Sequence, residues 1–148
     1  MSMRGFALGL VAIGCLSAVG DVAAEPIETR QTIMQSVGAA AKVSGGMAKG
    51  EIAFNPDVAM AALATFAAAG HSFASFFPEG SETGNDTEAK ATIWEDMEGF
   101  IAASTKFADD ASAAMAAKPA DLDAFKAAFG SVAENCKACH EDYRVSRN

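Results

Sequence analysis

The sequence predicts an all-α fold, an antiparallel four-helix bundle, and three observations support this prediction. Alanine is abundant and runs of β-branched residues are absent, which favours helix over strand. Apolar residues recur at spacings of three and four in four separate stretches. Mostly short segments link these stretches, and short links make consecutive helices antiparallel neighbours in a bundle.

The N-terminal residues 1–24 have the layout of a secretory signal peptide. Arg4 gives a positive start, residues 6–19 are almost entirely apolar, and small residues at 22–24 precede a cleavage point before Glu25. The apolar run is shorter than the roughly 20 residues that cross a bilayer, which disfavours a permanent anchor. We therefore expect export to the periplasm and a mature chain, residues 25–148, that forms one domain without a membrane span.

The first helix is expected at residues 27–49. Its apolar face contains Met34, Arg30 lies beside that face, and the glycine pair at 45–46 weakens the helix end. The face as a whole consists of Ile27, Met34, Val37 and Ala41.

The second helix is expected to begin with Asn55 as its N-cap, Pro56 in the first helical position and Asp57 near the positive helix end. Pro78 ends it. Its predicted core stripe is Val58, Ala62, Phe66, Ala69, Phe73 and Phe77.

A polar loop is expected at residues 79–90, with Asp86 or Thr87 as the cap of the third helix. Pro119 separates the third helix from the fourth. The third stripe is Ile93, Met97, Phe100, Ser104, Phe107, Ala111 and either Met115 or Ala114. The fourth is Leu122, Phe125, Phe129, Val132, Cys136, Cys139 and Tyr143.

Charge and cysteine content narrow the function. The formal net charge is −8 at pH 7, which disfavours nucleic acid and anionic membranes as partners. Of the three cysteines, Cys15 lies in the expected leader, so the mature chain keeps only Cys136 and Cys139. A lone cysteine pair in an oxidising compartment is expected to form a disulfide. The close spacing of these two is therefore informative.

The fourth stretch ends in the motif Cys136-Lys137-Ala138-Cys139-His140. Spacings of three and four place both thiols and the imidazole on one side of a helix. A thiol–disulfide exchange site is expected beside a βαβ pattern, which this sequence lacks. A structural zinc site needs four ligands, and the one other histidine is His71.

Covalent haem attachment is the third interpretation, because Cys-x-x-Cys-His is its recognised pattern. Each thiol adds across one haem vinyl group, and His140 supplies an axial nitrogen. The expected export agrees with this interpretation. A haem-free helical interaction module with a structural disulfide stays open as a different class of function.

The stretch from Ile27 to Arg144 resembles the class II c-type cytochromes, the cytochrome c′ and cytochrome c-556 family. The most specific part is DLDAFKAAFGSVAENCKACHEDYR at 121–144, with weaker support from RQTIM at 30–34, MAKGE at 47–51, FFPEGSE at 76–82 and IWEDMEGF at 93–100. The resemblance implies a four-helix bundle with one covalently bound haem c. It implies Cys136 and Cys139 as thioether anchors and His140 as the fifth iron ligand.

The resemblance also implies roles for residues near the haem. Met34 takes the position that approaches the sixth coordination site. In the c-556 branch a methionine there binds iron in a six-coordinate electron carrier, whereas in the c′ branch that residue is apolar and a five-coordinate, high-spin haem takes NO or CO. Arg30 matches a partner of a haem propionate, Gln31 a residue at the haem edge, and Glu88 a loop position near the haem.

Together these expectations describe a periplasmic electron carrier with His140 and Met34 as axial ligands. It would exchange electrons with redox partner proteins and would not be an enzyme. The alternative is a c′-type protein that binds NO or CO, with Met34 only a residue of the distal pocket. Analogy with the family adds a possible homodimer formed through the first two helices.

Overall fold

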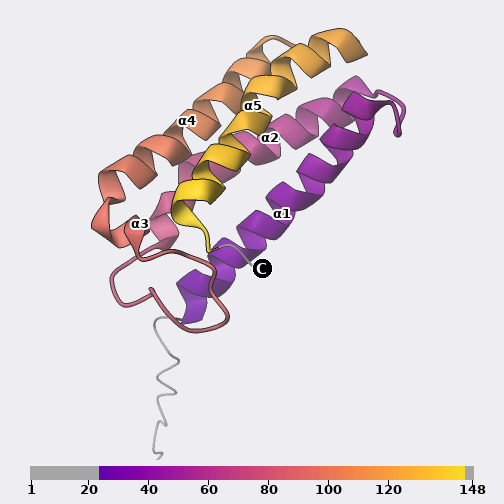
Figure 1. The fold of residues 1–148 in the computed structure, drawn as a ribbon. Helices are drawn as coiled ribbons and strands as arrows, with labels where there is room; N and C mark the ends of the chain where they lie inside the picture. The colour runs from indigo at the N-terminus through magenta and orange to yellow at the C-terminus, as the bar shows by residue number, and fades with distance from the viewer. Residues whose placement is uncertain (1–23, 146–148) are drawn as a thin grey trace, which may run out of the picture.

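The computed structural model describes residues 24–145, which contain four long helices and one short one (Figure 1). The long helices are α1 (Ala24–Lys49), α2 (Pro56–Ser72), α4 (Met97–Ala116) and α5 (Leu122–Tyr143). α1 packs against α2 and α5, and α4 packs against the same two helices. The predicted all-α four-helix fold is confirmed. The expected leader lies outside the described residues, apart from Ala24 at the start of α1.

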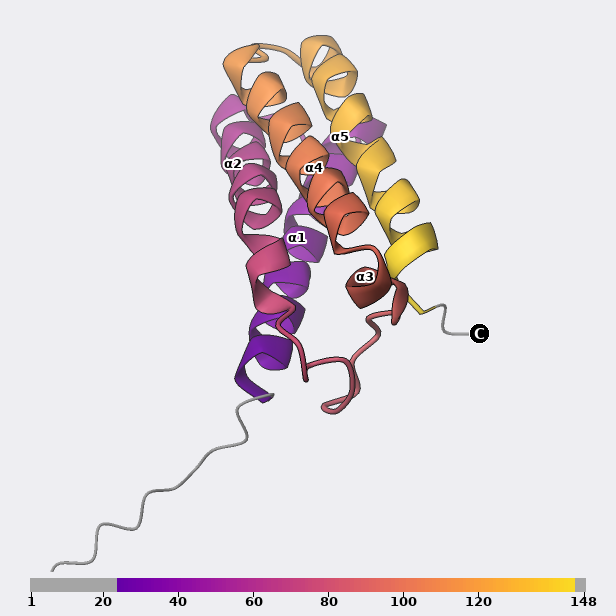
Figure 2. The same cartoon turned by 90° about the vertical axis from the view of Figure 1, so that its left-hand side faces the viewer.

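The connection between α2 and α4 is the most irregular part of the described chain. It contains a 3-10 turn, η1 (Phe73–Phe76), a loop, and the short helix α3 (Thr92–Glu95). Figure 2 shows this connection at one end of the bundle, below the last turn of α5. The loop returns to α5 through an antiparallel β-bridge between Ala89 and Arg144.

Side-chain caps fix where the helices begin. Asn55 Oδ1 accepts hydrogen bonds from the backbone N–H groups of Asp57 and Val58, at 2.9 and 3.1 Å, which confirms the expected cap of α2. Asp121 Oδ1 accepts from the N–H of Ala124 at 2.9 Å and caps α5 in the same way. At its C-terminal end, α1 continues through the glycine pair at 45–46 to Lys49.

The third predicted helix is divided at Asp96. The backbone of Asp96 leaves the helical region, at φ −131° and ψ 59°, and its side chain accepts from the N–H of Gly99 at 3.0 Å. An added Cβ at Gly99 would lie 2.1 Å from Asp96 Oδ2, so a larger residue there would require the Asp96 side chain to shift. The prediction that Asp86 or Thr87 caps this helix is wrong, because both lie in the loop before α3.

The buried face of α2 differs from the predicted stripe at its start. Val58 is 42% exposed, whereas the next residue, Ala59, is fully buried. Close packing on α4 explains the difference, since an added Cβ at Gly70 would lie 2.7 Å from the backbone nitrogen of Ala108. The face of α2 that carries Gly70 therefore turns inward. Its buried residues are Ala59, Ala62, Leu63, Phe66, Ala67, Ala69 and Gly70.

The stretch Pro56–Phe76 is the one helical segment of residues 24–145 that is long and apolar enough to cross a membrane by length and composition. It also packs against both α1 and α4 within the bundle. A core helix of a soluble protein meets the same length and hydropathy criteria.

The hydrophobic core of the described chain consists of two clusters. The larger cluster joins all four long helices through side chains such as Val37, Phe66 and Phe125. The smaller cluster is centred on Phe77, Ile93 and Phe100 and lies beside the irregular connection. A well-filled bundle would have one continuous core. The division indicates a space inside this bundle.

Candidate functional site

A cavity of about 760 Å³ lies between the two core clusters. Val37 and Ala69 line it from the larger cluster, and Phe77, Ile93 and Phe100 line it from the smaller one. The volume is typical of a small-molecule or cofactor pocket, and such pockets combine apolar walls with a few polar groups. The polar groups of this cavity come mainly from α1, from α5 and from the loop before α3.

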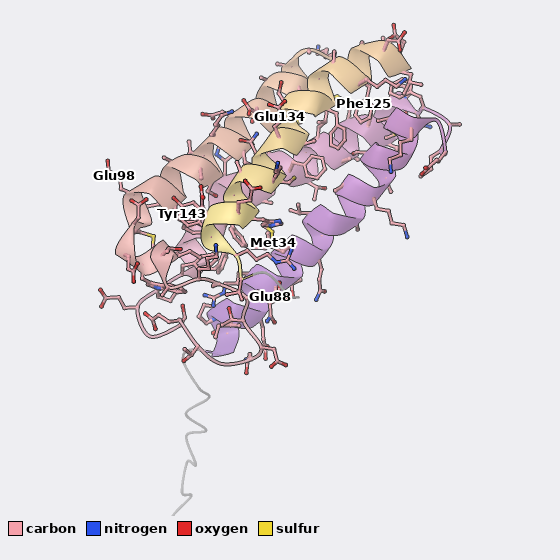
Figure 3. The ribbon with its side chains drawn as sticks, in the orientation of Figure 1. Met34, Glu88, Glu98, Phe125, Glu134 and Tyr143 are labelled. Carbon is pink, nitrogen blue, oxygen red and sulfur yellow. The ribbon has the colours of Figure 1, made fainter. Side chains whose placement is uncertain are left out.

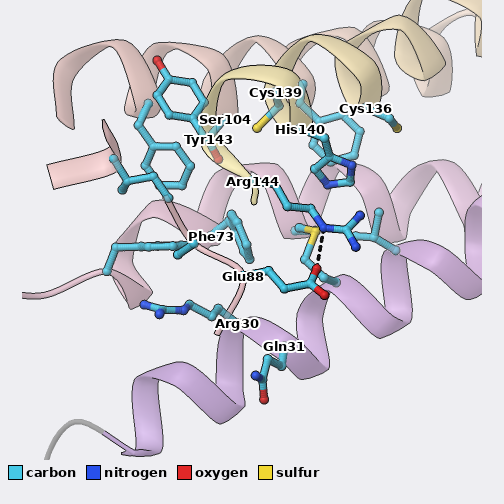
Figure 4. Close-up of a pocket in the computed structure, with 18 of the residues that line it drawn as sticks. Arg30, Gln31, Phe73, Glu88, Ser104, Cys136, Cys139, His140, Tyr143 and Arg144 are labelled. Atoms are coloured by element: carbon cyan, nitrogen blue, oxygen red, sulfur yellow. Dashed lines mark hydrogen bonds and ion pairs between the residues drawn. The ribbon is translucent and has the colours of Figure 1, made fainter. Parts of the chain in front are cut away.

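The cysteine–histidine motif lines the cavity from α5. Cys136, Cys139 and His140 all contribute to its wall, because α5 remains a regular helix through Tyr143 (Figure 4). Both cysteines are free and half-buried. Burial raises the pKa of the Cys136 thiol, and burial together with Cys136 and Asp142 raises the pKa of the Cys139 thiol. The two sulfurs are therefore neutral thiols at physiological pH.

The surroundings of the His140 imidazole favour its neutral form, although the residue as a whole is exposed. Burial lowers its pKa, and the positive charge of Arg144 lowers it further, while Glu88 acts in the opposite direction. Neutral imidazole is the form that ligates metals. The electrostatic surroundings of His140 therefore suit an axial ligand.

Met34 lines the cavity from α1, the neighbouring helix. Figure 3 shows it on the side of α1 that faces the C-terminal part of α5. Its side chain is half-buried and packs against the larger core cluster. The structure thus brings the thioether of Met34 and the imidazole of His140 to one cavity, from two different helices.

Arg30 is buried at the edge of the same cavity, with 3% of its surface exposed. Its guanidinium donates to the carbonyl of Phe76 (3.3 Å), to the hydroxyl and carbonyl of Ser81 (3.2 and 2.8 Å) and to the hydroxyl of Thr87 (2.7 Å). It also lies over the ring of Phe77, 4.5 Å from the ring centre. Burial lowers the pKa of Arg30, and Glu82 opposes this shift. Arg30 therefore fixes the loop that closes the cavity.

Gln31 and Glu88 also line the cavity and hold the same loop. The side-chain amide of Gln31 donates to the carbonyl of Asn85 at 2.7 Å. Glu88 Oε2 accepts from Arg144 Nε at 2.5 Å, the interaction dashed in Figure 4. The predicted site residues from the first helix, the loop and the last helix therefore meet at one place.

Three polar residues at or beside this site, Ser81, Thr87 and Asn135, are not among those predicted for it. Ser81 and Thr87 accept hydrogen bonds from Arg30, and Asn135, which precedes Cys136, donates to Asp110 Oδ2 at 2.6 Å. Each pair joins residues at least 25 positions apart, so no local pattern marks it. The one signal in the sequence is Asn135, a polar residue on the apolar face of the last helix. In the structure Asn135 is buried, and buried polar side chains need hydrogen-bond partners.

The zinc alternative finds no support in the described chain. Among residues 24–145, no group of three or more His, Cys, Asp and Glu side chains is arranged to hold a metal ion. His71 is exposed at the end of α2 and is not among the residues that line the cavity.

Comparison with known proteins agrees with the site. A family model described as "Cytochrome C'" matches residues 25–144. Cytochrome c′ from Rhodopseudomonas palustris is 37% identical over 142 residues, which cover 95% of this chain and 94% of that protein. Cytochrome c-556 from Agrobacterium fabrum is 33% identical over 134 residues, 90% of each chain.

Two solved structures extend the comparison to the fold. Cytochrome c′ from Rhodopseudomonas palustris matches with a TM-score of 0.80 and 36% identity, over 83% of this chain and 98% of that one. A nitric oxide complex of a mutant cytochrome c prime from Alcaligenes xylosoxidans matches with a TM-score of 0.73 and 27% identity, over 84% and 97%. Cytochrome c′ proteins bind one covalently attached haem c, so the cofactor expected from the sequence is confirmed. This chain belongs to the cytochrome c′ family of class II c-type cytochromes.

Proposed function

We propose that this protein is a periplasmic electron carrier whose haem c is attached through Cys136 and Cys139 and ligated by His140 and Met34. One observation carries the proposal: a single cavity is lined by two free thiols and an imidazole on α5 and by a thioether on α1. When bound, the haem supplies a one-electron Fe(III)/Fe(II) couple. The leader expected at residues 1–24 supports the periplasmic location.

The cavity fits a covalently held haem in both size and donor chemistry. Its volume of about 760 Å³ separates the two halves of the core, so a large apolar group would restore a continuous interior. Cys136 and Cys139 are free to form thioethers, and His140 is neutral and ready to bind iron. The phenylalanine side chains of the smaller cluster would keep water from the haem and tune its reduction potential.

Met34 supports electron transfer because a thioether is a soft iron ligand, and Met/His ligation raises the reduction potential. Its unbranched side chain has three rotatable bonds, which let it reach the iron from α1. Its half-buried position at the cavity wall leaves it room to do so.

Three polar residues would complete the site. The four hydrogen bonds of Arg30 use four of its five N–H groups, and we propose that the remaining one is available to a haem propionate. Gln31 would lie at the haem edge, and Glu88 would hold Arg144 beside His140. Redox partner proteins and a homodimer stay predictions from the sequence.

A c′-type protein that binds NO or CO is the second candidate function. Two comparisons favour it: cytochrome c′ from Rhodopseudomonas palustris is slightly more identical to this chain than the c-556 protein, and one related cytochrome c prime was solved as a nitric oxide complex. On this alternative Met34 lines the distal side without binding the iron.

The optical spectrum of the reduced holoprotein, before and after CO is added, separates the two candidates. Electron transfer with Met34 bound predicts a low-spin ferrous spectrum that CO changes slowly. A high-spin ferrous spectrum and immediate CO binding would favour the second candidate. Met34→Leu keeps the side-chain volume and should turn the low-spin spectrum high-spin. Met60→Leu is the matched control, since Met60 packs against the same core cluster but does not line the cavity.

A further inference from the structure

A segment of the loop caps the last three carbonyl groups of α5, whereas the carbonyl of His140 accepts from the backbone N–H of Arg144 at 3.3 Å. The final carbonyl groups of a helix have no partner within the helix. Here the backbone N–H of Lys90 donates to the carbonyl of Tyr143 at 3.0 Å, and its Nζ donates to the carbonyl of Glu141 at 2.5 Å. The hydroxyl of Thr92 donates to the carbonyl of Asp142 at 3.0 Å. Two residues of one segment thus satisfy three successive terminal carbonyls.

We call this segment, residues 87–92, the strap. It also contacts the residues that follow α5. The backbone N–H of Val145 donates to the carbonyl of Glu88 at 2.8 Å, and the side chains of Glu88 and Arg144 form an ion pair. Ala89 and Arg144 form the antiparallel bridge. The strap therefore runs beside the chain that leaves α5.

The other end of the strap is fixed to α1. Thr87 Oγ1 accepts from the guanidinium of Arg30 at 2.7 Å and from the N–H of Ala89 at 3.3 Å. Arg30 lies one helical turn before Met34, and Glu141 follows His140 directly. The strap thus joins the two helices that line the cavity with Met34 and His140.

We infer that Lys90 and Thr92 are positioning residues for His140, because their caps hold the turn of α5 that presents the imidazole to the cavity. Helix ends without such partners open locally at almost no cost in free energy. In an open last turn the imidazole of His140 would leave its place while Cys136, one turn earlier, kept its own. This inference rests on the proposed role of His140 as an iron ligand.

The test uses the holoprotein with both side-chain caps removed, Lys90→Met together with Thr92→Val. These changes keep the aliphatic volume and the backbone hydrogen bond of Lys90 to Tyr143. Lys126→Met with Thr105→Val is the matched control, because both residues are exposed and lie outside the strap and the cavity. Lys90→Arg with Thr92→Ser keeps both donors and should behave like the unchanged protein.

Two measurements report on the last turn of α5. The first is hydrogen exchange of the backbone amides of residues 140–143, which should become about fivefold faster in the cap variant, given the usual strength of exposed hydrogen bonds. The second, made in a Met34→Leu background so that it does not depend on which candidate function holds, is a stopped-flow record of NO added to the ferrous haem, because iron that has bound NO holds its imidazole ligand less tightly. The rate at which the six-coordinate nitrosyl form loses the imidazole should rise by a similar factor.

The outcomes separate this inference from the proposed function. Faster exchange and faster imidazole loss in the cap variant alone, with unchanged helix content by circular dichroism, support the inference. A covalently haem-loaded protein in which the cap variant and the control lose the imidazole at equal rates overturns the inference and leaves the proposed haem site standing. A protein that carries no covalent haem overturns both.

Discussion

The hydroxyl of Ser104 on α4 donates a 2.7 Å hydrogen bond to the carbonyl of Gly70 on α2, and both residues line the cavity. The bond forms because the two helices meet at Gly70, where a side chain would collide with the backbone of Ala108. The cavity wall between α2 and α4 is therefore set by this one close approach.

Replacing Gly70 with alanine should destabilise the protein. The new Cβ would lie 2.7 Å from the nitrogen of Ala108, and such overpacking costs roughly 1–3 kcal/mol. Chemical denaturation of the holoprotein measures this loss. Gly130→Ala in α5 is the matched control, because an added Cβ there has no neighbour within 4 Å and alanine favours helix by up to about 1 kcal/mol. Equal effects of the two substitutions would contradict the close packing of α2 on α4.

Arg30→Met should lower the free energy of unfolding by about 2–3 kcal/mol, because several acceptors would lose their donor. These are the carbonyl groups of Phe76 and Ser81 and the hydroxyl groups of Ser81 and Thr87. Arg30→Lys should restore only part of the loss, since an ammonium group cannot reproduce the planar fork. Thermal and denaturant unfolding test both variants. Lys42→Met, at an exposed position of α1, should change stability by less than about 0.5 kcal/mol, and a loss equal to that of Arg30→Met would refute the role of Arg30.

Asp110 should make a small, pH-dependent contribution to stability. Hydrogen bonds from Lys106 and then from Asn135 hold the pKa of Asp110 below its ordinary value of 3.8, although burial acts the other way. A lowered folded-state pKa means that the contribution is complete above the unfolded-state pKa and is lost as the pH falls through the folded-state value. Because Lys106 is 66% exposed, we expect less than about 1 kcal/mol.

Unfolding curves of Asp110→Asn and the unchanged protein between pH 7 and pH 2 test this prediction. The variant should be less stable at neutral pH, and the difference should disappear at the acid end. Asp109→Asn, at the exposed neighbouring position, should show no such convergence. A difference that grows as the pH falls would have the wrong sign for a carboxylate with a lowered pKa.

Most of the fold follows from signals that act within a few residues. The Asn55 cap and the Pro119 break are visible in the sequence because each affects only its own helix end. The sequence does not show which face of α2 turns toward the core, since an alanine-rich helix offers two similar apolar faces. Val58 and Ala59 differ in burial because of how closely α4 approaches, and that approach is a tertiary property.

The candidate site likewise has one part that the sequence predicts and one part that it does not. Helical periodicity alone places Cys136, Cys139 and His140 on one face, and the structure brings all three to the cavity. The pairing of Arg30 with Ser81 joins residues 51 positions apart and depends on the path of the loop. That path includes left-handed backbone at Gly80, Gly84, Asn85 and Asp86, and periodicity gives no information about such a path.

The attachment of haem through Cys136 and Cys139 is tested most directly by mass spectrometry of the denatured protein. The protein is purified from a host that matures c-type cytochromes and then digested. The peptide that contains residues 136–140 should carry the added mass of one haem, and Cys136→Ser with Cys139→Ser should remove it. A peptide that carries no added haem mass, with the two sulfurs free or joined to each other, would contradict the proposed attachment.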